Sequence, residues 1–261
     1  MDVKGKVVVV TGGGNGIGKA LCRRFAANGA KLMVSDRDMN AAQGVADELG
    51  AKAFACDVSR EEDIVKLVAA TVAELGDIDL FCSNAGVGFG DGGPLATSAA
   101  NSVWQTCWDI HVMAHVYAAR AVLPSMIARG SGYFLQTVSA AGLLNQIGDA
   151  AYSTTKHAAI GFAESLAITH RDDGIKVSVL CPQYVATRLI GIEEGADFSD
   201  QAGVISPEAA ADVVVKGLAE EQFIILTHPE VALFKQRKAE DYDRWISGMS
   251  KLRKKLMGAI R

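Results

Sequence analysis

Tyr152 and Lys156 are four residues apart in a segment with helical apolar spacing, and Ser139 lies upstream of them. Side chains four apart on a helix share one face, so the phenol and the ammonium are expected to be neighbours. The pKa of a free Tyr is about 10, and a nearby positive charge favours the phenolate. The pair therefore predicts a group that exchanges protons near neutral pH, although a surface Tyr and a solvated Lys would have the same spacing.

A glycine-rich turn near the start of the chain connects an expected strand to an expected helix. The β-branched run at residues 7–10 is typical of a strand buried on both faces, and it leads into the turn at residues 11–18. Glycines let the backbone approach a ligand closely, and the N-terminus of a helix attracts a pyrophosphate. The glycines follow the spacing G-x-x-x-G-x-G rather than G-x-G-x-x-G. The turn predicts a dinucleotide-phosphate site.

Polar side chains follow the next strands, where an open α/β sheet binds a nucleotide. Asp36 ends the second expected strand, where a carboxylate accepts hydrogen bonds from the adenosine ribose and repels a 2′-phosphate. Asp36 could instead cap the next helix, a role equally open to Asp38. Arg37 could stack on adenine or meet a phosphate, which keeps NADP as the alternative to NAD. Asp57 is either an adenine partner or a structural residue, and Asn84 is either a turn former or a polar spacer beneath the cofactor.

Strand-like runs alternate with helical patterns along the whole chain. Strands are expected at residues 7–10, 31–35, 52–56, 78–82, 133–138, 176–181 and 223–226, and a long helix over 100–129. We therefore predict an α/β fold, a single-domain Rossmann-type doubly wound parallel sheet of about seven strands with helices on both faces. Ser59 with Glu62 predicts a capping box for one helix, and Ser206 is the expected cap of the helix that begins at Pro207.

The predicted domain spans residues 1–261, with a substrate loop or lid at 183–205 and a helical tail at 229–261. Three positions remain open for the tail. It could cover the mouth of the active site, pack on a neighbouring subunit, or lie on its own domain.

The composition is ordinary for a globular protein with a substantial core, at 49% hydrophobic and 21% charged residues. The formal net charge of -4 argues against nucleic acid or an anionic membrane as partner, and the basic run at 251–255 is best read as a solvated helix end. The five cysteines form no C-x-x-C pair, so we expect no metal site and buried free thiols in a reducing compartment. With no apolar signal core and no run of eighteen apolar residues, a soluble cytoplasmic protein is expected.

Taken together, these motifs resemble the short-chain dehydrogenase/reductase family over about residues 5–227. The resemblance is carried by Thr11-Gly12-x-x-x-Gly16-Ile17-Gly18, Asp57-Val58, Asn84-Ala85-Gly86, Ser139, Tyr152-x-x-x-Lys156, and Pro182 with Val185 and Thr187. It implies a nicotinamide cofactor and hydride exchange with an alcohol or carbonyl. It also implies that Tyr152 is the acid and base, that Lys156 lowers its pKa and holds the nicotinamide ribose, and that Ser139 bonds the reacting oxygen.

The same resemblance implies contacts of Val185 and Thr187 with the carboxamide. The full set of residues expected to hold the cofactor is Gly12, Asn15, Gly16, Ile17, Gly18, Asp36, Arg37, Asp57, Val58, Asn84, Ala85, Gly86, Tyr152, Lys156, Pro182, Val185 and Thr187. A homo-oligomer, dimer or tetramer, is a further implication. The apolar positions Val112, Val116, Ala119 and Val122 of the long helix fit such an interface, but would equally fit packing on the sheet.

Two positions depart from the family pattern. His111 stands where members usually carry an Asn that supports a water chain from the catalytic Lys, so His111 is either a catalytic relay residue or a packed polar residue. Gln183 stands where a Gly usually follows the Pro, which puts the loop conformation and the pocket wall in question.

Residues 87–89, 140–149 and 183–202 are expected to contact substrate, and they are mostly apolar with a few amides. They suggest a mostly apolar secondary alcohol or ketone, with Arg188 either recognising an acidic group or pairing with Glu193 or Glu194. Asp36 favours NAD and hence alcohol oxidation. The alternatives are an NADPH-dependent carbonyl reductase and a nicotinamide-binding regulatory or scaffold protein without turnover.

Overall fold

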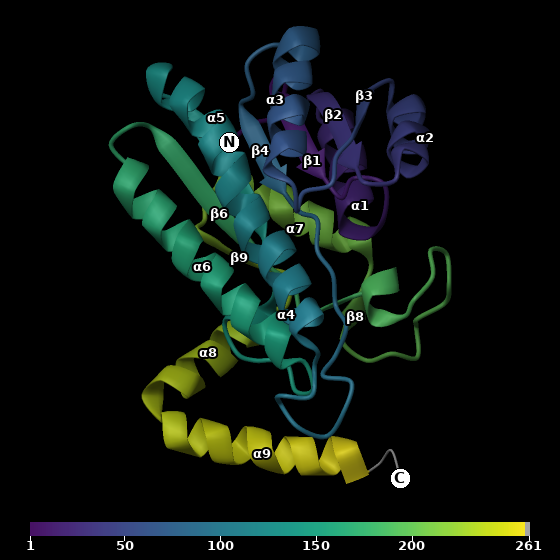
Figure 1. Cartoon of the computed structure of the whole chain (residues 1–261), viewed down its shortest axis with the longest axis vertical. Coiled ribbons are helices and arrows are strands. Elements are labelled where there is room, and N and C mark those ends of the chain that lie inside the picture. The colour runs from purple at the N-terminus through teal and green to yellow at the C-terminus, as the bar shows by residue number, and fades with distance from the viewer. Residues whose placement is uncertain (259–261) are drawn as a thin grey trace.

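A seven-stranded parallel sheet forms the centre of the protein (Figure 1). The computed structural model describes residues 1–258. The strand order is β3-β2-β1-β4-β5-β6-β9, which confirms the predicted Rossmann-type α/β fold. The strands are β1 Val7–Thr11, β2 Lys31–Asp36, β3 Lys52–Ala55, β4 Leu80–Ser83, β5 Gly132–Thr137, β6 Ile175–Cys181 and β9 Ile224–Leu226.

Helices cover both faces of this sheet because the strands are apolar on both sides. Along β1, Val7 and Val9 pack in one core cluster, while Val8 and Val10 pack in the other. Residues of α3 (Glu61–Leu75), α5 (Ala114–Ala128) and α6 (Ala150–His170) contribute to the first cluster. Residues of α1 (Gly16–Ala27), α2 (Met39–Leu49) and α7 (Pro207–Ala219) contribute to the second.

The order in which the chain adds strands to the sheet reverses between β1 and β4. From β1 the chain builds outward to β2 and β3, then returns to the other side of β1 with β4. The loops after β1 and β4 therefore diverge at the carboxyl edge, where open α/β sheets bind ligands. The glycine turn and residues 84–86 are the segments that follow these two strands.

The long helix before β5 contains a π-helical turn. It begins as α4 (Asn101–Trp108), passes through a π-helix at Asp109–Met113 and continues as α5. Its extent confirms the predicted helix, but the wider turn, centred on His111, was not predicted. By length and apolar composition Asn101–Ala128 is one span that could cross a membrane, although a core helix meets the same criterion and buried residues of this one pack on the sheet.

The helix caps show one wrong prediction and one confirmed one. Helix α3 begins at Glu61, so Ser59 is not its cap; the Ser59 backbone N–H and hydroxyl both donate to Asp57 Oδ1, at 3.0 and 2.7 Å. Local bonding to a preceding Asp competes with the capping box. Ser206 does cap α7, since its Oγ accepts from the Ala209 N–H at 3.0 Å.

A short pair of strands and a helical tail lie outside the main sheet. Strands β7 (Tyr184–Val185) and β8 (Val204–Ile205) form a separate parallel pair that was not predicted. The predicted helical tail consists of α8 (Glu230–Glu240) and α9 (Tyr242–Gly258), and its residues 259–261 lie outside the described part. Figure 1 shows α9 crossing one end of the molecule, beneath α4 and the start of α6.

Candidate active site

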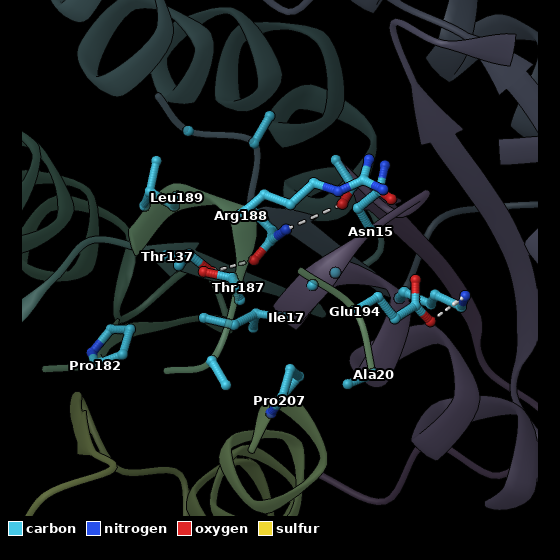
Figure 2. Close-up of a pocket in the computed structure, with 18 of the residues that line it drawn as sticks. Asn15, Ile17, Ala20, Thr137, Pro182, Thr187, Arg188, Leu189, Glu194 and Pro207 are labelled. Atoms are coloured by element: carbon cyan, nitrogen blue, oxygen red, sulfur yellow. Dashed lines mark hydrogen bonds and ion pairs between the residues drawn. The ribbon is translucent and has the colours of Figure 1, made fainter. Parts of the chain in front are cut away.

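A cleft of about 570 Å³ opens at the carboxyl edge of the sheet. Figure 2 shows Asn15 and Ile17 from the glycine turn together with Thr187, Arg188 and Glu194 from the segment after β7. Every residue predicted to hold the cofactor lines this cleft except Val185. Val185 belongs to β7, opposite Ile205 of β8, and its side chain is buried away from the cleft, so its predicted contact stays a prediction.

The glycine turn has the shape that a phosphate group requires. Gly12 and Gly16 have φ of +63° and +51°, and a Cβ at Gly12 would lie 2.9 Å from Ala85 Cα. The side chain of Asn15, the N-cap of α1, makes no capping hydrogen bond, and the first turn holds no acidic residue. The first N–H groups of α1 therefore remain available to an anion at a positive helix end. These residues fit the pyrophosphate of a dinucleotide.

Asp36 lies beside the glycine turn rather than at a helix cap. Its Oδ2 accepts from the Gly14 N–H at 3.1 Å, and its Oδ1 accepts from the Asp38 N–H at 3.1 Å. Asp38 is the cap of α2, accepting from the Asn40 and Ala41 N–H groups. The capping alternative for Asp36 is thus wrong, and its carboxylate is held at the place expected for a ribose.

Asn84 connects three strand ends beneath the cleft. Its Nδ2 donates to Thr11 O at 3.1 Å, and its Oδ1 accepts from Thr137 Oγ1 at 2.9 Å. Its own backbone N–H donates to Thr11 Oγ1 at 3.0 Å. Thr137, which lines the cleft, was not among the predicted site residues, and its place at the end of β5 was the available signal. This network fixes the floor of the cleft.

Tyr152 and Lys156 project from the first turns of α6 into the cleft. Asp149 caps this helix by accepting from the Tyr152 N–H at 3.1 Å. Lys156 Nζ donates to Thr137 O at 3.1 Å and lies 5.5 Å from the centroid of the Tyr152 ring. Burial lowers the pKa of Lys156 to about 8. A fully buried ammonium is thus held over the phenol by a main-chain carbonyl.

Burial raises the pKa of Tyr152, and the neighbouring Ser139 hydroxyl acts in the opposite direction. The predicted lowering of this pKa by Lys156 is therefore not achieved by the protein groups alone, because desolvation of the phenolate is the larger effect. Ser139 Oγ accepts from the Ala141 N–H at 3.0 Å and donates to Pro182 O at 3.4 Å, a long bond that a ligand oxygen could replace.

His111 is fully buried in the π-helical turn, and both ring nitrogens have partners. Nε2 accepts from the Val87 N–H at 3.1 Å, so the ring proton is on Nδ1, which donates to Thr155 Oγ1 at 2.9 Å. Burial, then the Lys156 charge, lowers the His111 pKa well below its usual range. A neutral ring with both nitrogens engaged favours the packed role over the predicted relay role.

A second cavity, of about 770 Å³, lies on the other side of Ser139. Of the predicted substrate segments, Ala140 and Ala141, residues 144–147, and Gln183 with Tyr184 contribute to it. Ten residues of the 183–205 loop, between Ala186 and Phe198, line the dinucleotide cleft instead, and Arg188 pairs with Glu193 at 2.8 Å. The remaining wall comes from α8, Asp241 and α9, in line with one of the three positions left open for the tail, next to the active site. Among residues 1–258 no group of three or more His, Cys, Asp or Glu could hold a metal ion.

Most of the apolar positions on the long helix that had suggested an oligomer interface are buried inside the chain instead. Val112, Ala119 and Val122 are buried within the chain itself, and Val116 is half-buried. Packing on the sheet accounts for these residues.

The chain is similar to known proteins over most of its length. The short chain dehydrogenase family profile matches residues 6–194. The chain is 32% identical over 256 residues to 1-deoxy-11-beta-hydroxypentalenate dehydrogenase of Streptomyces exfoliatus, covering 95% of this chain and 92% of that protein. It is 31% identical over 235 residues to epidermal retinol dehydrogenase 2 of Mus musculus, covering 86% and 74%. The crystal structure of a short chain dehydrogenase/reductase from Burkholderia phymatum in complex with NAD is similar with a TM-score of 0.83 at 29% identity, covering 93% and 96%.

Proposed function

Because this chain belongs to the short-chain dehydrogenase/reductase family, we propose that it is an NAD-dependent oxidoreductase acting on a mostly apolar secondary alcohol or its ketone. One observation carries the proposal. Tyr152 and Lys156 face the dinucleotide cleft, while Ser139, whose hydroxyl acts on Tyr152, opens into the second cavity. Cofactor and substrate placed in these two spaces meet at the phenol.

Different residues of the chain would bind the cofactor, bind the substrate and transfer the proton during alcohol oxidation. The glycine turn and the N-terminus of α1 would hold the pyrophosphate, and Asp36 the adenosine ribose. Lys156, with its ammonium at Thr137 O, would hold the nicotinamide ribose. Bound there, the nicotinamide supplies the hydride acceptor. Ser139 donates a hydrogen bond to the substrate oxygen. Tyr152 takes the hydroxyl proton as its phenolate, a state that the Lys156 ammonium and the positive charge of a bound nicotinamide would favour, as the carbon–oxygen bond becomes a carbonyl.

The preference for NAD rests on Asp36. Its carboxylate, oriented by two backbone N–H groups, would accept from a ribose hydroxyl and repel a 2′-phosphate. The alternative, an NADPH-dependent carbonyl reductase, would rely on Arg37, which is exposed at the cleft.

Initial rates with NAD and with NADP, measured by nicotinamide absorbance across a panel of secondary alcohols, test the proposal. We expect kcat/KM at least tenfold higher with NAD. A clear preference for NADP would reverse the assignment of Asp36. If the cofactors bind and no alcohol or ketone reacts, the protein is a nicotinamide-binding regulatory or scaffold protein.

Two further properties belong to the same proposal. A homo-oligomer is supported by exposed apolar side chains on the helices that the family resemblance points to, Trp108 at 42% on α4 and Ile168 at 79% on α6. A reducing, cytoplasmic location is supported by five free and buried cysteines. Light scattering of the purified protein tests the first, and fractionation of the source cells tests the second.

A further inference from the structure

Helix α9 presents one apolar face to the second cavity. The lining residues of this helix are spaced three or four apart, as one face of a helix requires, and are Arg244, Trp245, Gly248, Met249, Leu252 and Leu256. Leu144 and Ile147, from the loop after Ser139, line the same cavity. Apolar side chains thus come from two segments about a hundred residues apart in the sequence.

Lys238 of α8 joins this helical unit to the catalytic part of the chain. Its Nζ donates to Leu143 O and to Leu144 O, both at 2.9 Å, and the side chain is buried. Leu143 and Leu144 directly follow the 3₁₀ turn Ala140–Gly142 that begins after Ser139. An ammonium shared by two carbonyls holds α8 against the loop that positions the Ser139 hydroxyl.

The third proton of Lys238 is directed at the Tyr152 helix. His157 Nδ1 lies 2.8 Å from Ser153 O, so that nitrogen carries the ring proton and Nε2 is an acceptor. Lys238 Nζ is 3.3 Å from this Nε2. It also lies 5.4 Å from the ring centroid of Tyr242, the first residue of α9. Lys238 therefore contacts the Ser139 loop, the residue next to Lys156, and the start of α9.

The C-terminal half of α9 is hydrogen-bonded to a different loop. Arg253 donates to Pro94 O at 2.6 Å, in the loop between β4 and α4. That loop is in turn held at the start of α6, where Asp91 Oδ1 accepts from the Ala150 N–H at 2.7 Å. The helix, which crosses one end of the molecule in Figure 1, is thus attached near both ends, and residues between these attachments line the cavity.

We propose that α8 and α9 form a substrate-recognition wall clamped by Lys238, which makes this enzyme selective for bulky apolar secondary alcohols over small ones. The inference rests on the proposed function for its reaction and adds the substrate class. A volume of about 770 Å³ is within the range that holds a drug-sized molecule. A four-carbon alcohol would leave most of the apolar wall uncovered, whereas a fused-ring substituent would reach Trp245 and Met249.

Charged side chains limit how apolar the whole substrate can be. Arg237, Glu240, Asp241 and Arg244 lie along the same cavity, at the α8–α9 junction. A ligand that extends this far would carry a hydrogen-bonding group at the end remote from the reacting carbon.

Turnover of two secondary alcohols, 1-(2-naphthyl)ethanol and 2-butanol, tests the wall. In Trp245→Ala we expect KM for the naphthyl alcohol to rise about tenfold or more, from lost apolar contact, with kcat little changed. Kinetics with 2-butanol should stay as in the wild type. Ile246→Ala is the matched control, because Ile246 is 58% exposed on the same helix and does not line the cavity. Equal KM values for the naphthyl alcohol in Trp245→Ala and wild type would overturn the inference.

Calorimetric titration with the naphthyl alcohol separates this inference from the proposed function. Saturable binding to the wild type that Trp245→Ala weakens about tenfold or more supports the wall even if no alcohol is oxidised. Absence of saturable binding overturns it even if small alcohols are oxidised.

Lys238 is tested as a positioning residue. Lys238→Met keeps the length of the side chain and removes its donors, so KM for the naphthyl alcohol should rise more than KM for 2-butanol. Lys238→Arg should restore much of the loss, and Lys235→Met, at an exposed position of the same helix, should behave as wild type. Equal changes for both alcohols would assign Lys238 a purely structural role and count against the clamp.

Discussion

The imidazole ring of His111 stands edge-on to the phenol ring of Tyr152, with centroids 5.2 Å apart and planes at 83°. His111 also holds the Val87 N–H, in the loop after β4, and Thr155 of α6. Through these contacts the π-helical turn sets the position of the phenol ring. The His111 side chain thus contacts Tyr152 through ring packing.

His111→Asn should keep most of the activity, because an Asn side chain can also accept from the Val87 N–H. The pH profile of kcat/KM between about 5 and 8, where a free His titrates, should keep its shape, because burial lowers the pKa of His111 well below its usual range and the Val87 N–H holds Nε2 as an acceptor. Steady-state rates across that range provide the measurement. A loss of a hundredfold or more would show that His111 does more than replace an Asn.

Tyr152→Phe should reduce kcat about 10²- to 10⁴-fold, the usual contribution of a positioned general acid and base. The ring that packs against His111 is retained, so the fold and the affinity for NAD should change little. NAD binding by fluorescence titration is the control. Undiminished oxidation of every competent alcohol would contradict the catalytic role.

Lys156→Met should stabilise the protein at pH 7. The folded-state pKa of Lys156 is about 8 against an ordinary 10.5, so near neutral pH the native state carries a buried charge that costs about 3 kcal/mol. Between pH 8 and 10.5 the unfolded state binds more protons than the native state, so wild-type stability rises with pH through that window relative to the variant.

Urea unfolding at pH 7 and pH 10 measures this difference. We expect Lys156→Met to be more stable by about 2 kcal/mol at pH 7, after loss of the bond to Thr137 O, with a smaller gap at pH 10. Lys216→Met, at a side chain that is 77% exposed, is the control and should show no pH-dependent gap. A gap that widens with pH would refute the assignment.

Gly18→Ala should destabilise the protein by about 3 kcal/mol or more and weaken cofactor binding. A Cβ at Gly18 would lie 2.0 Å from Gly12 O and 2.7 Å from Asn84 Nδ2, so the backbone of the turn must move. Gly44→Ala is the matched change inside α2, where a Cβ meets nothing within 4 Å. That variant should gain about 0.5–1 kcal/mol, and equal unfolding midpoints for the two variants would count against the close packing of the turn.

The sequence predicted the sheet and the dinucleotide cleft because both are encoded locally. A buried valine run, a glycine turn and an acid at a strand end each have a physical meaning that neighbouring residues alone determine. The π-helical turn was not predicted, because the apolar pattern around His111 is the same as that of an ordinary α-helix. For the tail that contains α9, a position at the active site was only one of three left open. The apolar face of a helix indicates that another part of the protein covers it. The Lys238 contacts that position this helical unit, however, are made to residues 94 and 95 positions away in the sequence, which a local pattern does not reveal.

The two cavities have separate linings: within residues 1–258 no side chain lines both. Tyr152 lines only the dinucleotide cleft, so an alcohol held against the α9 wall must extend past Ser139 to bring its hydroxyl to the phenol. The reacting end of such an alcohol would share the cleft with the nicotinamide, while its bulky remainder would lie apart from the cofactor.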